Sequence, residues 1–418
     1  MEGKVNNKFS NLPAGWEVKK LKDVFYINEL ALPANTPSDF QFRYIPIEKV
    51  STNHIDYENC EQFEFQDAPG RARRIIRQND ILISGVRPNL KSFAIFKKPD
   101  DKNWICSTGF FVLTAKQPED NLISYYELLS EICGSQFYSL VVGTNYPAIG
   151  DSDIRNIRLI LPSSKEEKTA VANILSKVDE AIVSVQNSID AAERLKKSLM
   201  QNLLTGKMKP DGTFRTPDEF YIDEKFGKVP VGWHWGRLSE IADIIAGQSP
   251  QGEYYNVNGM GKPMLNGPTE FTDKYPVPVQ WTTKITKLCK KGDILFTVRG
   301  SSTGRMNLAD QEYCIGRGLA AIRPKSNNNI SFIYYTLLKI SEMILAEAKG
   351  AGTTFPNVSR GELMKKVILI PDTHQNEIIA PIEQLASFSN SKQRSIDKLE
   401  ILKKSLMQNL LTGRIKIL

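Results

Sequence analysis

The chain has 418 residues, 41% of them hydrophobic and 24% charged, which is ordinary for a globular protein of two to three domains. No apolar run reaches about 18 residues and the N-terminus lacks the apolar core of a signal peptide, so we expect neither a membrane span nor export. The formal net charge of +7 favours an anionic partner but does not identify one.

The cysteines and histidines give no sign of a metal site. The five cysteines are odd in number and form no C-x-x-C pair, which indicates reduced thiols and a cytoplasmic location. The three histidines, His54, His234 and His374, are far apart and lack metal-ligand spacing. We therefore expect no metal and no cofactor.

Strand-like segments dominate the first part of the chain, after a short helix predicted next to Gly15 and Trp16. A helix with apolar residues on one side is predicted at 124–133, and a proline ends the last strand at 158–162. Residues 1–162 are therefore predicted to form one mixed α+β domain. The earlier strands are expected at 43–47, 80–84, 92–96 and 110–113.

A long helix is predicted at 163–206. Apolar residues recur there at alternating intervals of four and three, which is the heptad pattern of a helix packed along another helix. Ser164 is a suitable N-cap and Gly206 a suitable terminator, and the helix would be roughly 60 Å long at about 1.5 Å per residue. The seam is expected to contain Val171, Leu175, Val178, Ile182, Val185 and Ile189 and, after a shift by one residue, Leu195, Leu199 and Leu203.

The second part of the chain repeats this plan after a polar connector at 207–229. A second domain is predicted at 230–371, and a second long helix within 372–418 is the natural partner of the first. The strand, helix and final strand of the second domain are expected at 293–298, 332–345 and 366–370. The contact residues of the second long helix are expected to be Ile396, Leu399, Leu402, Leu406 and Leu410.

The two halves are copies of one unit. Residues 195–207 read LKKSLMQNLLTGK and residues 402–414 read LKKSLMQNLLTGR, so only the last position differs across an offset of 402 minus 195, or 207 residues. This offset is far longer than the roughly 20–50 residues of a solenoid repeat. Shorter matches occur at the PAGW and PVGW motifs, at two D-I-L strands and at two T-x-[YF]-P segments, while the sequences between them diverge. The pattern predicts a shared frame whose two copies recognise different things.

Catalytic signatures are not found in the sequence. It contains no G-x-x-x-x-G-K-[ST] phosphate loop and no G-x-G-x-x-G after a strand. It also contains no Pro-Pro, which rules out the Asn/Asp-Pro-Pro-aromatic tetrad that holds a flipped adenine in amino-methyltransferases. We therefore expect a protein that is not an enzyme.

Four arginines within seven residues of the first domain could grip phosphates or read a guanine edge. They are Arg71, Arg73, Arg74 and Arg77, and the alternative is a solvated edge strand. The loop after the strand at 80–84 is a second candidate, because its turn chemistry places polar side chains at a loop tip. These side chains are Arg87, Asn89 and Lys91.

The equivalent loop of the second domain has two arginines around small hydroxyl residues, so both copies place an arginine there. Its candidates are Arg299, Ser301, Ser302 and Arg305, and the alternative is a glycine-rich hairpin with exposed arginines. The T-x-[YF]-P segments fit either a DNA-facing loop or a core-anchoring turn, with candidates Asn145, Tyr146, Thr353, Thr354 and Asn357. Gln248 and Ser249 lie in a polar segment that could read adenine or be an ordinary turn.

Taken together, these motifs resemble the specificity subunit of bacterial type I restriction-modification systems. The resemblance covers the whole chain, and its most specific motif is the helix end LLTG, which occurs twice. The motif IP-x-GW that precedes each domain in this family reads LPAGW at 12–16 and VPVGW at 229–233.

The resemblance implies two target recognition domains that each read one half of a split, asymmetric double-stranded DNA site. It implies that the two long helices lie antiparallel as a coiled coil and set the spacer between the half-sites. Two methyltransferase subunits and two motor-nuclease subunits are implied as partners, while the specificity subunit itself has no catalytic role. The helix residues given above are then expected to hold the helix pair together and to dock partners.

Two other classes of protein compete with this interpretation. One is an enzyme, such as a fused methyltransferase or a nuclease, which the missing motifs disfavour. The other is a coiled-coil adaptor protein without DNA specificity, whose arginine-rich loops are simply solvated. The salt dependence of DNA binding separates the adaptor from a protein that contacts phosphates.

Overall fold

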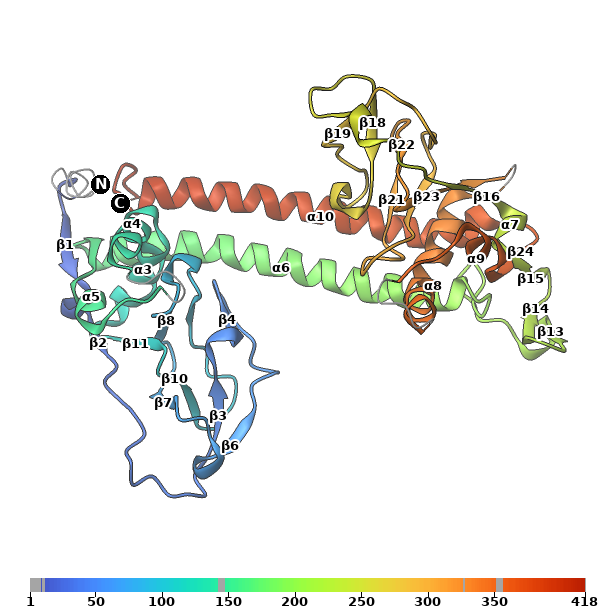
Figure 1. Cartoon of the computed structure of the whole chain (residues 1–418). Helices are drawn as coiled ribbons and strands as arrows, with labels where there is room; N and C mark the ends of the chain where they lie inside the picture. Colours follow the sequence, from blue (N-terminus) through green and yellow to red (C-terminus); the bar gives the residue numbers. More distant parts are fainter. Residues whose placement is uncertain (1–8, 10–11, 142–146, 326–327, 351–355, 418) are drawn as a thin grey trace. The chain divides into compact units, whose positions relative to one another are not determined.

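Figure 1 shows the computed structural model of the chain, which describes residue 9 and residues 12–141, 147–325, 328–350 and 356–417. The chain divides into two compact units. Unit 1 consists of Met1–Gln186 together with Arg394–Leu418, and unit 2 consists of Asn187–Gln393. Each unit therefore contains one part of each long helix. Across the described ranges, no helix combines the length and the apolar character needed to cross a membrane.

In unit 1 a strand, and not the predicted helix, follows Gly15. β1 (Trp16–Lys20) pairs antiparallel with β12 (Arg158–Pro162) over the full length of both strands. The segment alternates apolar and polar residues at its start, which is the period of a strand, and the pairing buries Trp16. The short helix α2 (Leu21–Val24) comes only after this strand.

Two four-stranded sheets make up most of the rest of unit 1, as far as the chain is described. The central strand β8 (Ile81–Ser84) is buried on both faces. Ile81 and Ile83 belong to a core shared with the helices, and Leu82 belongs to a second core between the two sheets. One sheet has the order β2 (Phe25–Ile27), β11 (Phe110–Ala115), β8 (Ile81–Ser84), β9 (Phe93–Ile95), and the other β6 (Gln62–Glu64), β3 (Gln41–Ile45), β10 (Trp104–Ser107), β7 (Ala72–Ile75).

The helix predicted at 124–133 is in fact two helices, α3 (Pro118–Leu129) and α4 (Glu131–Leu140). The break lies at Ser130, whose backbone is extended and whose Oγ accepts a hydrogen bond from the N–H of Cys133. A serine in this role starts a new helix, so the periodic apolar pattern alone cannot reveal the break.

Unit 2 repeats the architecture of unit 1 with different loops. β15 (Trp233–Arg237) pairs antiparallel with β24 (Val367–Pro371), as β1 pairs with β12. One of its four-stranded sheets has the order β16 (Ala242–Ala246), β23 (Leu319–Pro324), β20 (Ile294–Thr297), β21 (Met306–Leu308). The other has the order β17 (Tyr255–Asn256), β19 (Gln280–Thr282), β18 (Lys262–Leu265), β22 (Cys314–Ile315). Its helices include α7 (Leu238–Ile241), α8 (Ile330–Gly350), which extends the helix predicted at 332–345, and α9 (Arg360–Lys365).

The polar connector between the two copies contains a hairpin that the sequence did not predict. β13 (Phe220–Asp223) pairs with β14 (Gly227–Pro230). Its aromatic residues anchor it to β15, because Phe226 stacks on Trp235 with 5.0 Å between the ring centroids. Aromatic contacts of this kind stabilise a hairpin that would be marginal alone.

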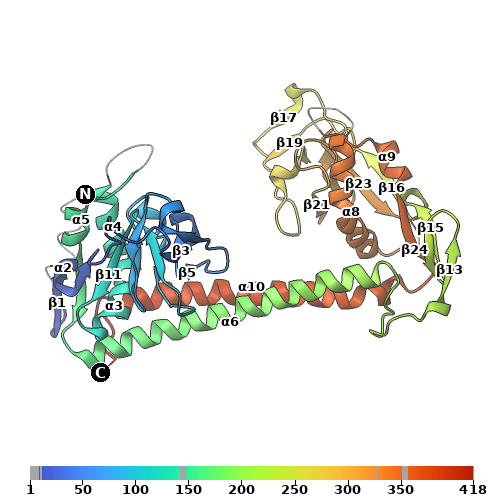
Figure 2. The same cartoon turned by 90° about the horizontal axis from the view of Figure 1, so that it is seen from below.

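The long helices are α6 (Lys165–Leu203) and α10 (Gln375–Leu410). In unit 1, Leu175 near the start of α6 shares a core with Leu410 at the end of α10. In unit 2, Leu203 at the end of α6 shares a core with Ile382 near the start of α10. The helices therefore pack antiparallel within each unit, and Figure 2 shows them side by side.

The heptad seam does not shift at Leu195, as the sequence led us to expect. Leu195 and Leu402 are 51% and 47% exposed, so neither lies in the seam. The intervals of four and three continue instead through Lys196 and Lys403, and Lys403 is only 7% exposed. A lysine thus holds a seam position in the repeated segment, with its aliphatic stem available for packing. The other predicted helix contacts are buried or half-buried: Val171, Leu175, Val178, Ile182, Val185, Ile189, Leu199, Leu203, Ile396, Leu399, Leu406 and Leu410.

Candidate nucleic-acid interface

In each unit the structure brings the loop after the D-I-L strand against the proline that ends the T-x-[YF]-P motif and the residue after it. In unit 1 the N–H of Arg87 donates to the carbonyl of Pro147 at 2.7 Å. In unit 2 the N–H of Gly300 donates to the carbonyl of Pro356 at 2.9 Å. Two segments far apart in sequence therefore form one surface in each copy.

The arginines of the two loops are one residue out of register. The bridge between Val86 and Ala148 corresponds to the bridge between Arg299 and Asn357, so Arg299 replaces Val86 and not Arg87. The prediction that both copies place an arginine at one position is therefore wrong. The offset is already present in the sequence, because Arg87 follows Asp80 of the D-I-L motif by seven residues whereas Arg299 follows Asp293 by six.

The two loops nevertheless have the same backbone. Arg87 and Lys91 have φ angles of +48° and +50°, and the corresponding glycines, Gly300 and Gly304, have +86° and +93°. This left-handed conformation suits glycine and costs other residues roughly 1–2 kcal/mol. Unit 1 therefore holds two basic residues in the left-handed conformation, whereas unit 2 has glycine at both corresponding positions.

A third segment, the turn before β11 or β23, completes each surface. The N–H of Gly85 donates to the carbonyl of Gly109, and that of Val298 donates to the carbonyl of Gly318, both at 2.9 Å. In unit 2 this turn carries Arg317, whose N–H donates to Ser249 Oγ at 3.1 Å.

Unit 2 has an open cleft of about 690 Å³ at this surface. The cleft is lined by Arg299 and by Gln248 and Ser249, which belong to the polar segment predicted from the sequence. Arg317 and Asn266 also line it. Arginine reads guanine, while glutamine and asparagine read adenine, through paired hydrogen bonds. The other lining residues are Gly247, Pro250, Tyr255 and Gly318.

Glycines on both sides of Arg317 leave room for Asn266 to pack closely against this turn. A Cβ on Gly316 would stand 2.2 Å from Asn266 Oδ1, and one on Gly318 would stand 2.2 Å from the Asn266 carbonyl. The Asn266 side-chain amide donates to Gln280 Oε1 at 2.8 Å, and this hydrogen bond orients the Asn266 side chain. Arg317 and Asn266 are not among the residues predicted from the sequence, although the motif Gly-Arg-Gly is typical of a close backbone approach.

Two arginines of the unit 1 cluster, Arg73 and Arg74, lie on β7 at the edge of its sheet, and Arg71 and Arg77 lie on either side of this strand. Arg73 is half-buried, with its guanidinium 4.7 Å from the centroid of the Phe65 ring, and Arg77 pairs with Glu29 at 3.5 Å. Arg74 is half-buried as well, whereas Arg71 is exposed. The carbonyl of Arg71 accepts the N–H of Thr108, the counterpart of Arg317, so Arg71 is the member of the cluster next to the shared surface.

Lys91 does not extend from a loop tip. Its Nζ donates to the carbonyl of Leu129 at the end of α3, and burial lowers the pKa of its ammonium group. Its amine therefore satisfies a helix end, while Asn89 in the same loop is exposed.

The remaining candidates of unit 2 lie in or beside its loop. Arg299 Nε donates to Asn357 Oδ1 at 3.2 Å, which holds two candidate side chains together. Arg305 is exposed and donates to the carbonyl of Phe271 at 3.1 Å. Ser301 is exposed and Ser302 is half-buried. Asn145, Tyr146, Thr353 and Thr354 lie outside the described residues.

The aspartates of the D-I-L motif have a structural role behind these loops. Asp80 accepts hydrogen bonds from the Arg77 N–H at 2.7 Å and from Thr114 Oγ1 at 2.7 Å, and burial raises the pKa of its carboxyl group. Asp293 accepts the N–H of Lys290 at 2.7 Å and two hydrogen bonds from Arg323. Both residues fix the turn before the central strand, which positions the loop after it.

Comparison with known proteins places this architecture in one family. The chain matches the model described as type I restriction modification DNA specificity domain over residues 13–194 and again over 230–400. The MjaX type I restriction enzyme specificity subunit of Methanocaldococcus jannaschii is 28% identical over 424 residues, which span 98% of this chain and 96% of that protein.

Two solved structures agree with this result. A chain from a structure on complex assembly and conformational transition of the type I R-M system is 27% identical, has a TM-score of 0.57, and covers 97% of this chain and 100% of that chain. The type I restriction-modification S subunit of M. genitalium is 17% identical, has a TM-score of 0.58, covers 96% of each chain and shares the fold.

Proposed function

The chain belongs to the specificity subunits of type I restriction-modification systems, and we propose that it reads a bipartite, asymmetric DNA site for such a complex. We assign residues 1–162 and 230–371 as its target recognition domains, each reading one half-site. The subunit itself is not catalytic. Its proposed partners are double-stranded DNA, two methyltransferase subunits and two motor-nuclease subunits, in the cytoplasm.

The observation that carries this proposal is the cleft of unit 2. It gathers two arginines, a glutamine and an asparagine from segments that are distant in sequence, and these are the side chains that read base edges. Arg317 and Gln248 are the residues that we assign to guanine and adenine. Arg305 and the serines of the neighbouring loop are assigned to phosphates.

The differences between the two surfaces support unlike half-sites. The position of Arg299 is Val86 in unit 1, and the position of Arg317 is Thr108. We assign the first half-site to Arg71, Arg87 and Asn89, which lie in or beside the corresponding loop. Arginine contacts worth about 1–3 kcal/mol each would then fall on different bases in the two half-sites.

The exposed face of the repeated helix segment supports two docking sites for one kind of partner. Leu195 and Leu402 are exposed, as are Lys197 and Lys404. Core packing does not demand identity at exposed positions, yet these residues agree in the two copies whereas most of the chain has diverged. A partner that binds twice, such as the methyltransferase subunit, would require the same face at both places.

The experiment that tests this function is co-expression with the methyltransferase subunit of its own system, followed by mapping of methylated adenines across a genome. A motif of two unlike halves with a fixed gap supports the proposal. Soluble, associated subunits that add no methylation would contradict it. Binding to DNA that does not weaken with rising salt would instead favour the adaptor alternative, because phosphate contacts release counterions.

A further inference from the structure

A buried ion pair joins the two long helices in unit 1. Lys403 Nζ on α10 lies 2.6 Å from Asp179 Oδ1 on α6, with the two side chains 9% and 19% exposed. Lys403 holds the seam position described above, so the pair belongs to the helix interface and not to the surface. Charges this buried need partners, because an unpaired one carries a large desolvation cost.

The same aspartate is bound by the recognition domain. Its Oδ2 accepts a hydrogen bond from the hydroxyl of Tyr126 on α3 at 2.8 Å and one from Asn53 Nδ2 at 3.3 Å. The hydroxyl of Tyr125 donates to Asn53 Oδ1 on the other side of this amide. Asp179 is therefore the point at which α6, α10, α3 and the turn at Asn53 meet.

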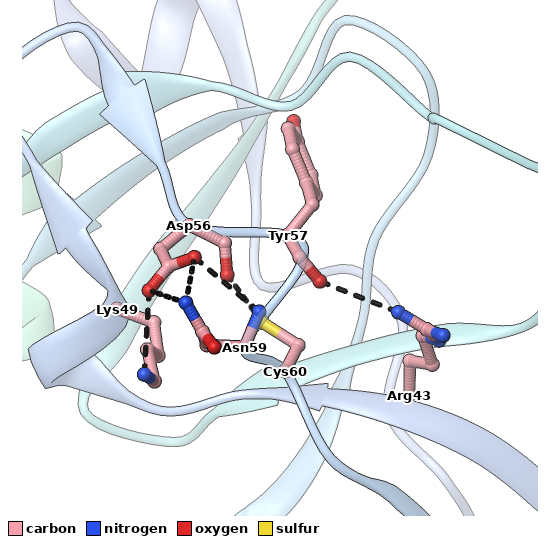
Figure 3. A network of polar contacts seen from close by, with 6 residues as sticks. All are labelled: Arg43, Lys49, Asp56, Tyr57, Asn59 and Cys60. Carbon is pink, nitrogen blue, oxygen red and sulfur yellow. Dashed lines mark hydrogen bonds and ion pairs between the residues drawn. The ribbon is translucent and has the colours of Figure 1, made fainter. Parts of the chain in front are cut away.

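Asn53 lies at the turn of the hairpin formed by β4 (Val50–Ser51) and β5 (His54–Ile55). Figure 3 shows how the base of this hairpin is held: Asp56 lies 3.3 Å from Lys49 Nζ and accepts hydrogen bonds from the Asn59 amide at 3.0 and 3.1 Å. The hairpin is thus tied at its base, while its turn is tied to the helix pair.

The turn of the hairpin also holds the end of the first recognition loop. Thr52 Oγ1 donates to the carbonyl of Lys91 at 2.7 Å, and the Asn53 N–H donates to the carbonyl of Phe93 at 3.0 Å. Lys91 is the last residue of the loop that contains Arg87 and Asn89. A continuous series of polar contacts therefore leads from Lys403 in the repeated segment to this loop.

Unit 2 lacks the aspartate and the loop lysine of this series. The helices align without a gap at the offset of 207, so the counterpart of Asp179 is Ala386 and that of Lys403 is Lys196. Lys196 pairs instead with Glu193 of its own helix, at 2.5 Å. The counterpart of Lys91 is Gly304, which has no side chain to reach a helix end.

We propose that Asp179 is a positioning residue that couples the helix pair to the first recognition loop, so that reading of the first half-site depends on the helix pair and reading of the second does not. The proposal rests on the proposed function. Asp179 acts through Asn53 and Lys91 and not by contact with DNA.

The test replaces the ion pair by an apolar pair of similar volume, Asp179→Leu with Lys403→Met, in the full chain bound to its methyltransferase subunits. Such replacements of buried ion pairs are often neutral or stabilising, so the helix seam stays packed. The matched control is Glu193→Leu with Lys196→Met in unit 2. A milder variant, Asn53→Gly, removes the side-chain contacts of this turn with Asp179 and Tyr125 and keeps its backbone contact with the loop, and glycine suits the φ of +63° at this turn.

The first measurement is amide hydrogen exchange, which does not depend on DNA. Exchange at 85–93 should become faster in the Asp179→Leu/Lys403→Met and Asn53→Gly variants and stay unchanged at 298–306. The control should leave 85–93 as in the wild type. Unchanged exchange at 85–93, or an equal effect of the control, would overturn the coupling.

The second measurement is methylation of DNAs that carry one base change in either half-site. The Asp179→Leu/Lys403→Met variant should lose about two- to thirtyfold in discrimination at the first half-site only. Equal losses at both half-sites would indicate a general defect and overturn the inference. Failure of the wild type to discriminate at either half-site would overturn the proposed function itself, whereas hydrogen exchange would still decide whether the loop is coupled to the helices.

Discussion

A Cβ atom on Gly413 would stand 2.9 Å from Cε2 of Trp16, so the end of α10 and the start of β1 pack without room for a side chain. The other copy has the same contact, because a Cβ on Gly206 would meet Pro230 at 2.5 Å and Trp233 at 3.3 Å. The glycine that ends each long helix therefore docks on the G-W motif of the other repeat. This contact gives a physical reason for the two most specific motifs of the sequence.

Gly413→Ala should destabilise unit 1 by more than the roughly 1–2 kcal/mol expected for alanine at a positive φ. The φ of Gly413 is +64°, and its Cβ would also meet Pro13 at 2.8 Å. Gly15→Ala is the control, because Gly15 has a φ of +85° and nothing within 4 Å of its Cβ position. Denaturant unfolding of both variants measures the difference, and equal losses would argue against the close contact.

Arg317→Ala should lower discrimination at the second half-site by about 5- to 150-fold, which corresponds to a contact of about 1–3 kcal/mol. Discrimination at the first half-site should not change, which provides a control within the same molecule. Arg299→Ala should act on the same half-site, because both arginines line one cleft. Binding or methylation of DNAs with single base changes measures both effects, and a loss at both half-sites would refute separate reading.

Leu195→Glu and Leu402→Glu should each remove one methyltransferase subunit from the complex without unfolding the chain, because both leucines are exposed. The double variant should bind none. Val183→Glu is a matched control, since Val183 is 56% exposed on α6 but lies outside the repeated segment. Native mass spectrometry of the purified complexes counts the subunits, and full occupancy in the double variant would rule out this face as the docking site.

Seven residues inserted after Gln186 in α6 and after Gln393 in α10 should lengthen the DNA spacer while both half-sites stay the same. These two positions correspond across the repeat and mark the boundary between the units. Seven residues add about 10 Å of helix, which equals roughly three base pairs at about 3.4 Å each. Mapping of methylated sites measures the spacer, and an unchanged spacer would mean that the helices do not set it.

Glu127→Gln should make unfolding less dependent on pH. Glu127 is fully buried, and burial raises the pKa of its carboxyl from 4.5 to about 8. The folded chain therefore keeps a proton that the unfolded chain releases, so the wild type should lose stability as the pH rises from about 5 to 8. The slope is at most about 1.4 kcal/mol per pH unit. Denaturant unfolding at pH 5 and pH 8 checks this, and the same slope in both proteins would contradict it.

The sequence predicted those parts of the architecture that depend on apolar periodicity and on repeated motifs. The long helices, the central strands and the duplication follow from apolar spacing and from repeated motifs, and the fold class is confirmed by the related structures. The seam was misassigned only at Leu195 and Leu402, because apolar spacing cannot recognise that Lys196 and Lys403 occupy the heptad positions.

The candidate site was predicted in its segments but not in its pairings. The loop at Arg299 and the segment at Asn357 were chosen separately, and their direct contact depends on hydrogen bonds between distant parts of the chain. Arg317 was not predicted, because only the sheet topology brings it to the cleft beside Gln248. Lys91 could not be assigned correctly from its loop, because the carbonyl that binds its amine belongs to α3.

The division into units has a consequence for the order of events on the ribosome. Unit 2 is continuous from Asn187 to Gln393, whereas the core of unit 1 includes Leu410 and Leu411. At about 5–20 residues per second, synthesis from Gln186 to Leu411 takes on the order of 10–45 s. The first domain leaves the ribosome first, but its core is complete only after the last segment of the chain has been made. Unit 2 can therefore complete its core before unit 1 does.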